Sequence, residues 1–235
     1  MKLYDDQGNE RDFFWEVSKH AGHLRLSHLS RHLALFEIYK NTLNLPGSVA
    51  EFGLYHGSTF FFLARLIEIF HASEHEVHHS ASRHLYGFES FEGFAEILPE
   101  DKAGINIGPK EVGGLKAESA VFFDTFETFK RDCRVAERLH VIKGDICATF
   151  KTFLEENAGV RLAFALVDFD LYDPTKAVLD RLHDIMVPGG IIVFDEYGFP
   201  DWPGETRAVD AFVKRHDLKL KALPWSFAPG AYCEV

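Results

Sequence analysis

Two apolar segments of this sequence end in carboxylates. The segment "RLAFALVDFD", residues 161–170, carries Asp168 and Asp170, and "GGIIVFDEYG", residues 189–198, carries Asp195 and Glu196. If the two segments are neighbouring parallel strands, these side chains meet at the edge of the sheet where open α/β sheets bind their ligands. Converging carboxylates repel one another, and a divalent cation relieves the repulsion; an all-carboxylate set suits magnesium. The pattern therefore predicts a cation site.

The alternative is that these acids cap helices or face solvent. For Asp173 we expect the structural role, because "DPT" is typical of a helix N-cap followed by proline at the first helical position. For Asp168 and Asp170 we expect a shared direction if the strand persists to its end, because side chains alternate along a strand. Both would then face the ligand crevice.

A second feature is the strand-to-helix turn in "EFGLYHGS", residues 51–58. Gly53 and Gly57 let the backbone turn tightly and approach a ligand, and the helix that begins near Ser58 offers free N–H groups. This arrangement favours a carboxylate-bearing cofactor. It lacks the third glycine of the dinucleotide pattern, and an ordinary turn is the alternative. His56 lies in the same turn and is a second, less favoured candidate for a catalytic base.

Two further acids follow predicted strands. Glu89 ends "YGFES", where an acid can accept hydrogen bonds from the vicinal hydroxyls of a ribose; a capping role at the loop start is the alternative. Asp145 in "KGDI" precedes a predicted helix, so it is expected as an N-cap, as a partner of an adenine amino group, or as both.

The elements that must position these residues alternate along the chain. A helix is predicted before Pro46, from apolar residues at three- and four-residue spacing: Leu26, Leu29, Leu33, Phe36 and Tyr39. The rest predicts an α/β fold with a mostly parallel sheet between helices. The predicted strands are 48–53, 84–90, 138–144, 161–170, 189–197, 218–224 and an edge strand, 230–235. The predicted helices are 57–70, 119–132, 146–157, 174–185 and 205–215.

Length and composition exclude several classes of function. We expect a helical extension, 1–46, and one domain, 47–235, in which the glycine-rich segment 91–118 is a lid or substrate loop. A net charge of -11 argues against nucleic-acid binding. We expect no membrane span, no signal peptide and a cytoplasmic location. The three isolated cysteines are expected to be reduced thiols. A small molecule is the expected partner.

Six ordered motifs together resemble the macrocin O-methyltransferase family, which are class I S-adenosylmethionine-dependent enzymes that methylate sugar hydroxyls. The motifs are "EFGLYHGS", "FESFEGF", "KGDI", "DFDLYDPTKAVLDRL", "PGGIIVFDEYG" and "WPGETRAVDAF". The resemblance covers roughly residues 47–216. It implies a Rossmann-like, seven-stranded, mostly parallel sheet whose last strand is antiparallel, with helices on both faces.

The resemblance also implies roles for individual residues. The methionine part of S-adenosylmethionine would be held by Glu51, Gly53, Tyr55, Gly57 and Ser58, the ribose by Glu89 and Ser90, and the adenine by Asp145 and Ile146. Asp168 would organise the strand end near the cofactor. Magnesium would be bound by Asp170, Asp195 and Glu196. The relatives have aspartate where this chain has Glu196, so the cation site departs from the family pattern there.

The resulting hypothesis is methyl transfer to a hydroxyl group of a sugar or glycosylated natural product, with magnesium and with Asp170 as the general base. Two alternatives stay open at this point. One is a nucleotide-sugar oxidoreductase on a similar sheet, and the other is a protein that binds the cofactor but has lost catalysis. The apolar N-terminal helix is expected either to cover the active site or to pack against a second subunit in a homo-oligomer.

Overall fold

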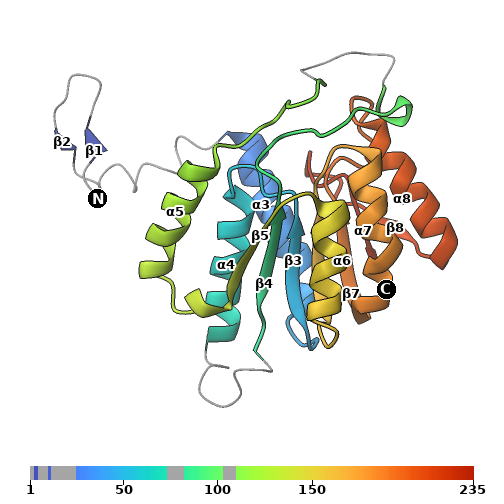
Figure 1. The fold of residues 1–235 in the computed structure, drawn as a ribbon. Helices are drawn as coiled ribbons and strands as arrows, with labels where there is room; N and C mark the ends of the chain where they lie inside the picture. Colours follow the sequence, from blue (N-terminus) through green and yellow to red (C-terminus); the bar gives the residue numbers. More distant parts are fainter. Residues whose placement is uncertain (1–2, 5–9, 12–24, 73–81, 103–109) are drawn as a thin grey trace.

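The computed structural model describes residues 3–4, 10–11, 25–72, 82–102 and 110–235. Apart from residues 3–4 and 10–11, these are arranged around one central sheet (Figure 1). The strand order is β5-β4-β3-β6-β7-β9-β8. The strands are β3 (Ser48–Phe52), β4 (Leu85–Glu89), β5 (Leu139–Lys143), β6 (Leu162–Val167), β7 (Met186–Phe194), β8 (Leu220–Lys221) and β9 (Ala231–Glu234). Strands β3 to β7 pair in parallel, and β9 is antiparallel to both β7 and β8. The predicted fold class is confirmed.

Helices cover both faces of this sheet (Figure 1). One face packs against α3 (Leu26–Tyr39), α4 (Ser58–His71) and α5 (Ser119–Arg131), and the other against α6 (Ile146–Glu156), α7 (Tyr172–Leu182) and α8 (Pro203–His216). Strand β6 is buried along its whole length, with Phe164 and Leu166 in the first core and Ala165 and Val167 in the second. This burial on both sides explains its continuous apolar sequence.

The remaining described elements are short. A separate antiparallel pair consists of β1 (Leu3–Tyr4) and β2 (Glu10–Arg11). Short 3₁₀ helices are η1 (Lys40–Thr42), η4 (Pro99–Asp101), η5 (Ala136–Arg138) and η6 (His183–Ile185). Among the described helices, no segment combines the length and the apolar character that crossing a membrane requires.

Strand register brings the predicted site residues to one edge. Phe52 at the end of β3 pairs with Phe88 of β4 and with Val167 at the end of β6, and Val167 pairs with Phe194 at the end of β7. The residues that follow these ends therefore meet at the carboxyl edge. They include Gly53, Glu89, Asp168 and Asp195.

Several boundaries differ from the predictions. Strand β6 ends at Val167 rather than at residue 170, because the chain turns there: Asp170 has a φ of 63°, and the Leu171 N–H donates to the carbonyl of Phe169 at 2.6 Å. Strand β7 begins and ends three residues earlier than predicted, and β8 keeps only 220–221 of the predicted 218–224. The alternation argument for Asp168 and Asp170 therefore does not apply.

The assignment of Asp173 as an N-cap is wrong. Helix α7 begins at Tyr172, its N-cap is Leu171, and Asp173 lies inside the first turn. The Tyr172 N–H instead donates to Oδ1 of Asp101 at 2.6 Å, so an amide at this helix start that has no partner within the helix is satisfied by a residue distant in sequence.

The N-terminal helix is confirmed, but only part of its predicted apolar face is buried: Tyr39 lies in the core and Phe36 packs against it, whereas the three leucines do not. Leu26, Leu29 and Leu33 are 81%, 39% and 48% exposed. The sheet is contacted by a different stripe, which includes Leu35 and Ile38, both buried. The helix therefore presents leucines to solvent while its other side reaches toward the carboxyl edge.

Candidate active site

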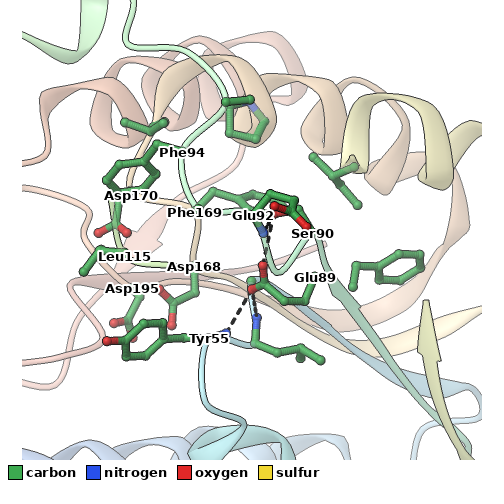
Figure 2. A pocket seen from close by; sticks show the side chains of 18 of the residues that line it. Tyr55, Glu89, Ser90, Glu92, Phe94, Leu115, Asp168, Phe169, Asp170 and Asp195 are labelled. Atoms are coloured by element: carbon green, nitrogen blue, oxygen red, sulfur yellow. Dashed lines mark hydrogen bonds between the residues drawn. The ribbon is translucent and has the colours of Figure 1, made fainter. Parts of the chain in front are cut away.

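A pocket of about 920 Å³ opens at the carboxyl ends of the parallel strands (Figure 2). Nearly all of the predicted site residues line it: Glu51, Gly53, Tyr55, Ser58, Glu89, Ser90, Asp145, Ile146, Asp168, Asp170, Asp195 and Glu196. Gly57 does not. The described part of the 91–118 segment forms one wall, through residues that include Phe94 and Leu115.

The two glycines of the first turn have different functions. Gly53 has a φ of 94°, and a Cβ atom there would lie 1.9 Å from the carbonyl oxygen of Asp168, so only glycine allows β3 and β6 to leave the sheet so close together. Gly57 has a φ of 83° and is the N-cap of α4; a Cβ atom would lie 2.6 Å from the ring of Phe122 on α5. Gly57 thus serves helix packing.

Glu89 connects the loops that follow β3 and β4. Its Oε2 accepts hydrogen bonds from the N–H groups of Leu54 and Tyr55, both at 3.0 Å, and its Oε1 accepts from Phe91 N–H at 2.9 Å and from the Ser90 hydroxyl at 3.3 Å (Figure 2). The carboxylate therefore organises the pocket floor and still faces the pocket. Both roles weighed from the sequence are compatible with this geometry.

Asp145 is an N-cap, as expected. Its Oδ1 accepts from the N–H of Cys147 at 3.0 Å at the start of α6, and it also lines the pocket. The Cys147 thiol is exposed beside the pocket. Partial burial, together with the charges of Asp145 and Asp173, raises its pKa to about 11.

Glu51 is a buried carboxylate inside a central strand. It is 1% exposed, and its Oε2 has no hydrogen-bond partner among the described residues. Burial raises its pKa well above the ordinary value, although the positive charge of Arg31 opposes this. A buried, unpaired acceptor that lines a pocket fits a cationic ligand group such as the ammonium of a bound amino acid.

The carboxylates that follow β6 and β7 form a close group, but its three residues differ from the three predicted as magnesium ligands. Oxygens of Asp168, Asp195 and Glu196 lie within 4.8 Å of one another, whereas Asp170 is outside this set. Burial, reinforced by the negative charge of Asp195, raises the pKa of Asp170 to about 7. Burial and Asp195 also raise the pKa of Asp168. The three oxygen donors suit a hard divalent cation.

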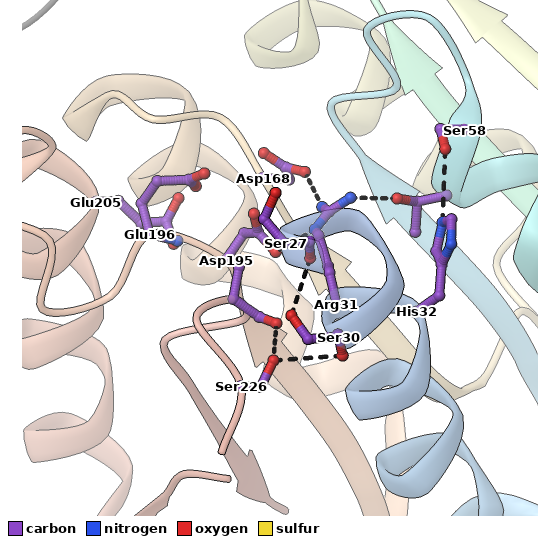
Figure 3. Close-up of polar contacts among 12 residues, drawn as sticks. Ser27, Ser30, Arg31, His32, Ser58, Asp168, Asp195, Glu196, Glu205 and Ser226 are labelled. Carbon is purple, nitrogen blue, oxygen red and sulfur yellow. Dashed lines mark hydrogen bonds and ion pairs between the residues drawn. The ribbon is translucent and has the colours of Figure 1, made fainter. Parts of the chain in front are cut away.

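A cationic side chain occupies this group in the structure (Figure 3). Arg31 of α3 donates from Nε to Asp195 Oδ1 at 2.9 Å, from Nη2 to Asp168 Oδ2 at 2.5 Å, and from Nη1 to the hydroxyl of Thr59. The sequence reasoning missed Arg31. The signal was present, because Arg31 stands four residues before Leu35 and seven before Ile38, on the stripe that α3 buries.

Glu205 of α8 was also missed. It is fully buried, and its Oε1 accepts the backbone N–H of Glu196 at 3.0 Å. Burial raises the pKa of both carboxyls, and the negative charges of Asp168 and Asp195 act in the same direction. Glu205 lies within the "WPGETRAVDAF" motif, but the helical periodicity of that segment does not predict that this glutamate is buried. It fixes the backbone on which Glu196 sits.

Comparison with known proteins identifies the family. The model of the macrocin O-methyltransferase family matches residues 12–223. This chain belongs to the macrocin O-methyltransferase family. The resemblance noted in the sequence is thereby confirmed.

Named relatives of this macrocin O-methyltransferase family member act on sugars. One is the 8-demethyl-8-(2,3-dimethoxy-alpha-L-rhamnosyl)-tetracenomycin-C 4'-O-methyltransferase of Streptomyces olivaceus, 26% identical over 157 residues, which are 65% of this chain and 54% of that protein. The match thus spans about half the length of this curated relative.

Solved structures of similar fold include CalS11, a calicheamicin methyltransferase, with a TM-score of 0.80 and 28% identity over 93% of this chain and 83% of the other. A second CalS11 structure, described as a TDP-rhamnose 3'-O-methyltransferase, has a TM-score of 0.73 and 27% identity, covering 95% and 86%. The O-methyltransferase NovP has a TM-score of 0.61 at 19% identity, covering 88% and 78%, and shares the fold.

Proposed function

We propose that this protein transfers the methyl group of S-adenosylmethionine to a hydroxyl group of a sugar or a glycosylated natural product. One observation carries the proposal. The residues that suit the cofactor and the carboxylates that follow β6 and β7 line the same pocket at the carboxyl edge of the sheet. Family membership and the sugar substrates named for the relatives support this reaction.

The residues on the β3 and β4 side fit the cofactor. The unpaired Oε2 of Glu51 suits the amino group of the methionine part, the carboxylate of Glu89 suits ribose hydroxyls, and Asp145 with Ile146 suits the adenine. Gly53, at the end of β3, lines the same pocket beside these residues. When bound, S-adenosylmethionine supplies an electrophilic methyl group.

Asp170 is the proposed general base. An alcohol is a poor nucleophile until its proton is removed, and the side chain of Asp170 lines the pocket without belonging to the close carboxylate group. A carboxylate whose pKa is raised to about 7 takes a proton more readily than an ordinary one and is still substantially ionised near neutral pH. Proton transfer from the acceptor hydroxyl to Asp170 would accompany methyl transfer.

Magnesium is the second proposed participant. The sequence suggested Asp170, Asp195 and Glu196 as ligands; the observed grouping favours Asp168 in place of Asp170, with Asp195 and Glu196. Such a cation would acidify a hydroxyl bound to it. The three carboxylates are suitable ligands for magnesium. Two of them, Asp168 and Asp195, form ion pairs with Arg31.

The test is methyl transfer from isotopically labelled S-adenosylmethionine, with TDP-rhamnose and a rhamnosylated polyketide as acceptors. We expect labelled product and one equivalent of S-adenosylhomocysteine. Calorimetry with S-adenosylmethionine and with NAD distinguishes the oxidoreductase alternative, since that alternative requires NAD to bind and S-adenosylmethionine not to. Tight S-adenosylmethionine binding without transfer to any acceptor would instead favour a protein that has lost catalysis.

The homo-oligomer suggested by the N-terminal helix is a separate proposal. The outward leucines of α3, Leu26, Leu29 and Leu33, support a contact with a second copy of the chain, because burying them would remove apolar surface from water. Sedimentation velocity of the wild type and of a Leu26→Ser, Leu33→Ser variant would test it; a monomeric wild type would rule it out.

A further inference from the structure

The acidic group of the active site has a resident positive charge. Arg31 makes two charge-assisted hydrogen bonds, to Asp168 and to Asp195, and its side chain is only 19% exposed. It also donates to Thr59 of α4, so every arm of its guanidinium is bonded. Three hydrogen bonds therefore fix the position of the Arg31 side chain.

A metal ion at this site would share two carboxylates with Arg31, which bonds to one oxygen of Asp195 and one oxygen of Asp168. Magnesium binds carboxylate oxygens at about 2.0–2.1 Å. An ion at that distance from Asp195 Oδ1 and Asp168 Oδ2 would be in close contact with guanidinium nitrogens that now lie 2.9 Å and 2.5 Å from the same oxygens. Two cations so close together in a partly buried site repel strongly. An ion bound to these two oxygens would therefore compete with Arg31 for them.

Helix α3, which carries Arg31, packs into the core mainly through its carboxyl half. The carboxyl half of α3 is anchored in the core by Leu35, Ile38 and Tyr39, whereas the amino half exposes Leu26 and Leu29. Besides Arg31, the described contacts of that half include a hydrogen bond of 3.4 Å from the Ser226 hydroxyl to the Ser30 carbonyl, and the ring of His32, which stacks on Phe62 at a centroid distance of 4.5 Å. Because the buried residues of α3 all lie between 34 and 39, a shift of its first turns would leave the core packed.

We propose that Arg31 is the resident cation of the acidic site, and that a divalent metal ion binds Asp168 and Asp195 only when Arg31 withdraws. The inference deepens the metal-assisted function proposed above and takes its functional meaning from it. The competition itself is measurable without cofactor, acceptor or turnover. A higher concentration of the metal ion would then shift the population of molecules toward those in which α3 has moved Arg31 away from the carboxylates.

The first test is Mn²⁺ binding, measured by electron paramagnetic resonance of the free ion. We compare the wild type, Arg31→Gln, Arg31→Lys and Arg25→Gln, in which a matched exposed arginine just before α3 is neutralised. We expect Arg31→Gln to bind Mn²⁺ at least tenfold more tightly than the wild type. Arg31→Lys and Arg25→Gln should both stay close to the wild type, and adding Asp168→Asn to Arg31→Gln should remove the gain.

Two results would overturn the proposal: equal affinities of wild type and Arg31→Gln, or no Mn²⁺ binding by either at millimolar concentration. If Arg31→Gln does not fold, hydrogen exchange of the wild type decides. Saturating Mn²⁺ should then accelerate exchange in residues 25–33 and not in 34–39, and unchanged exchange with bound Mn²⁺ contradicts exclusion. Methyl-transfer assays report separately on the proposed function, because they can fail while the competition holds.

Discussion

Replacement of Glu89 by glutamine should weaken both the fold and cofactor binding. The carboxylate accepts three backbone N–H groups, from Leu54, Tyr55 and Phe91. Glutamine has the same shape but only one acceptor oxygen. Whichever way its amide is turned, its NH₂ group faces at least one N–H donor, and the bonds that survive lose the charge.

The structure allows an estimate of the loss. A hydrogen bond to a charged group contributes about 1.5–3 kcal/mol and one to a neutral group about 0.5–1.5 kcal/mol. With about 1 kcal/mol lost at each of the three N–H groups, the free energy of unfolding should fall by about 3 kcal/mol. For a domain of this size, that lowers Tm by about 6–12 °C.

Thermal and urea unfolding followed by circular dichroism measure this change. The control is Glu127→Gln on α5, an exposed glutamate whose ion pair with Lys130 lies on the surface; its loss should cost less than about 0.5 kcal/mol. A Glu89→Gln protein that melts within about 2 °C of the wild type would refute the reasoning.

Calorimetric titration with S-adenosylmethionine then separates the two roles of Glu89. If ribose hydroxyls also donate to this carboxylate, the Kd should rise at least tenfold at a temperature where the variant is fully folded. A destabilised variant with wild-type affinity would show that Glu89 only organises the loops.

Three other expectations concern the same edge of the sheet. Asp170→Asn, which tolerates the left-handed backbone at that position, should lower turnover by about 10²–10⁴-fold and change S-adenosylmethionine affinity less than twofold; wild-type turnover would exclude Asp170 as the base. Gly53→Ala should abolish stable folding, since its Cβ would collide with the Asp168 carbonyl, whereas Gly159→Ala, with open space around it, should melt like the wild type. Cys147 should react with iodoacetamide at pH 8 about a hundredfold more slowly than a thiol of pKa 9, because its pKa is raised to about 11 and only the thiolate reacts. Its rate should rise about tenfold per pH unit up to that value, and an ordinary rate at pH 8 would contradict the assignment.

Much of the fold was readable from the sequence because strands and helices alternate with clear periods. The buried strand β6 and the turn around Gly53 followed from apolar runs and glycine chemistry, and parallel register then placed Asp168 and Asp195 at one edge. These are local or nearest-neighbour consequences of the chain. They needed no knowledge of long-range side-chain packing.

What could not be read depended on contacts distant in sequence. Helix α3 has apolar residues on two sides, so periodicity alone could not tell that Leu35 rather than Leu33 faces the sheet. The start of α7 is satisfied by Asp101, which the local "DPT" pattern cannot reveal. The bend at Asp170 ended β6 early and left Asp168, not Asp170, next to Glu196.

The pairing of Arg31 also has a consequence for the order of folding. Its partners Asp168 and Asp195 stand 137 and 164 positions later in the chain. During synthesis, α3 leaves the ribosome long before either carboxylate exists, and the pair of counter-charges around its guanidinium is incomplete until residue 195 of 235 has been made. Contacts of such sequence separation close late, because the chain entropy of the intervening loop must be lost first. The acidic site is therefore among the last parts of the molecule to be assembled.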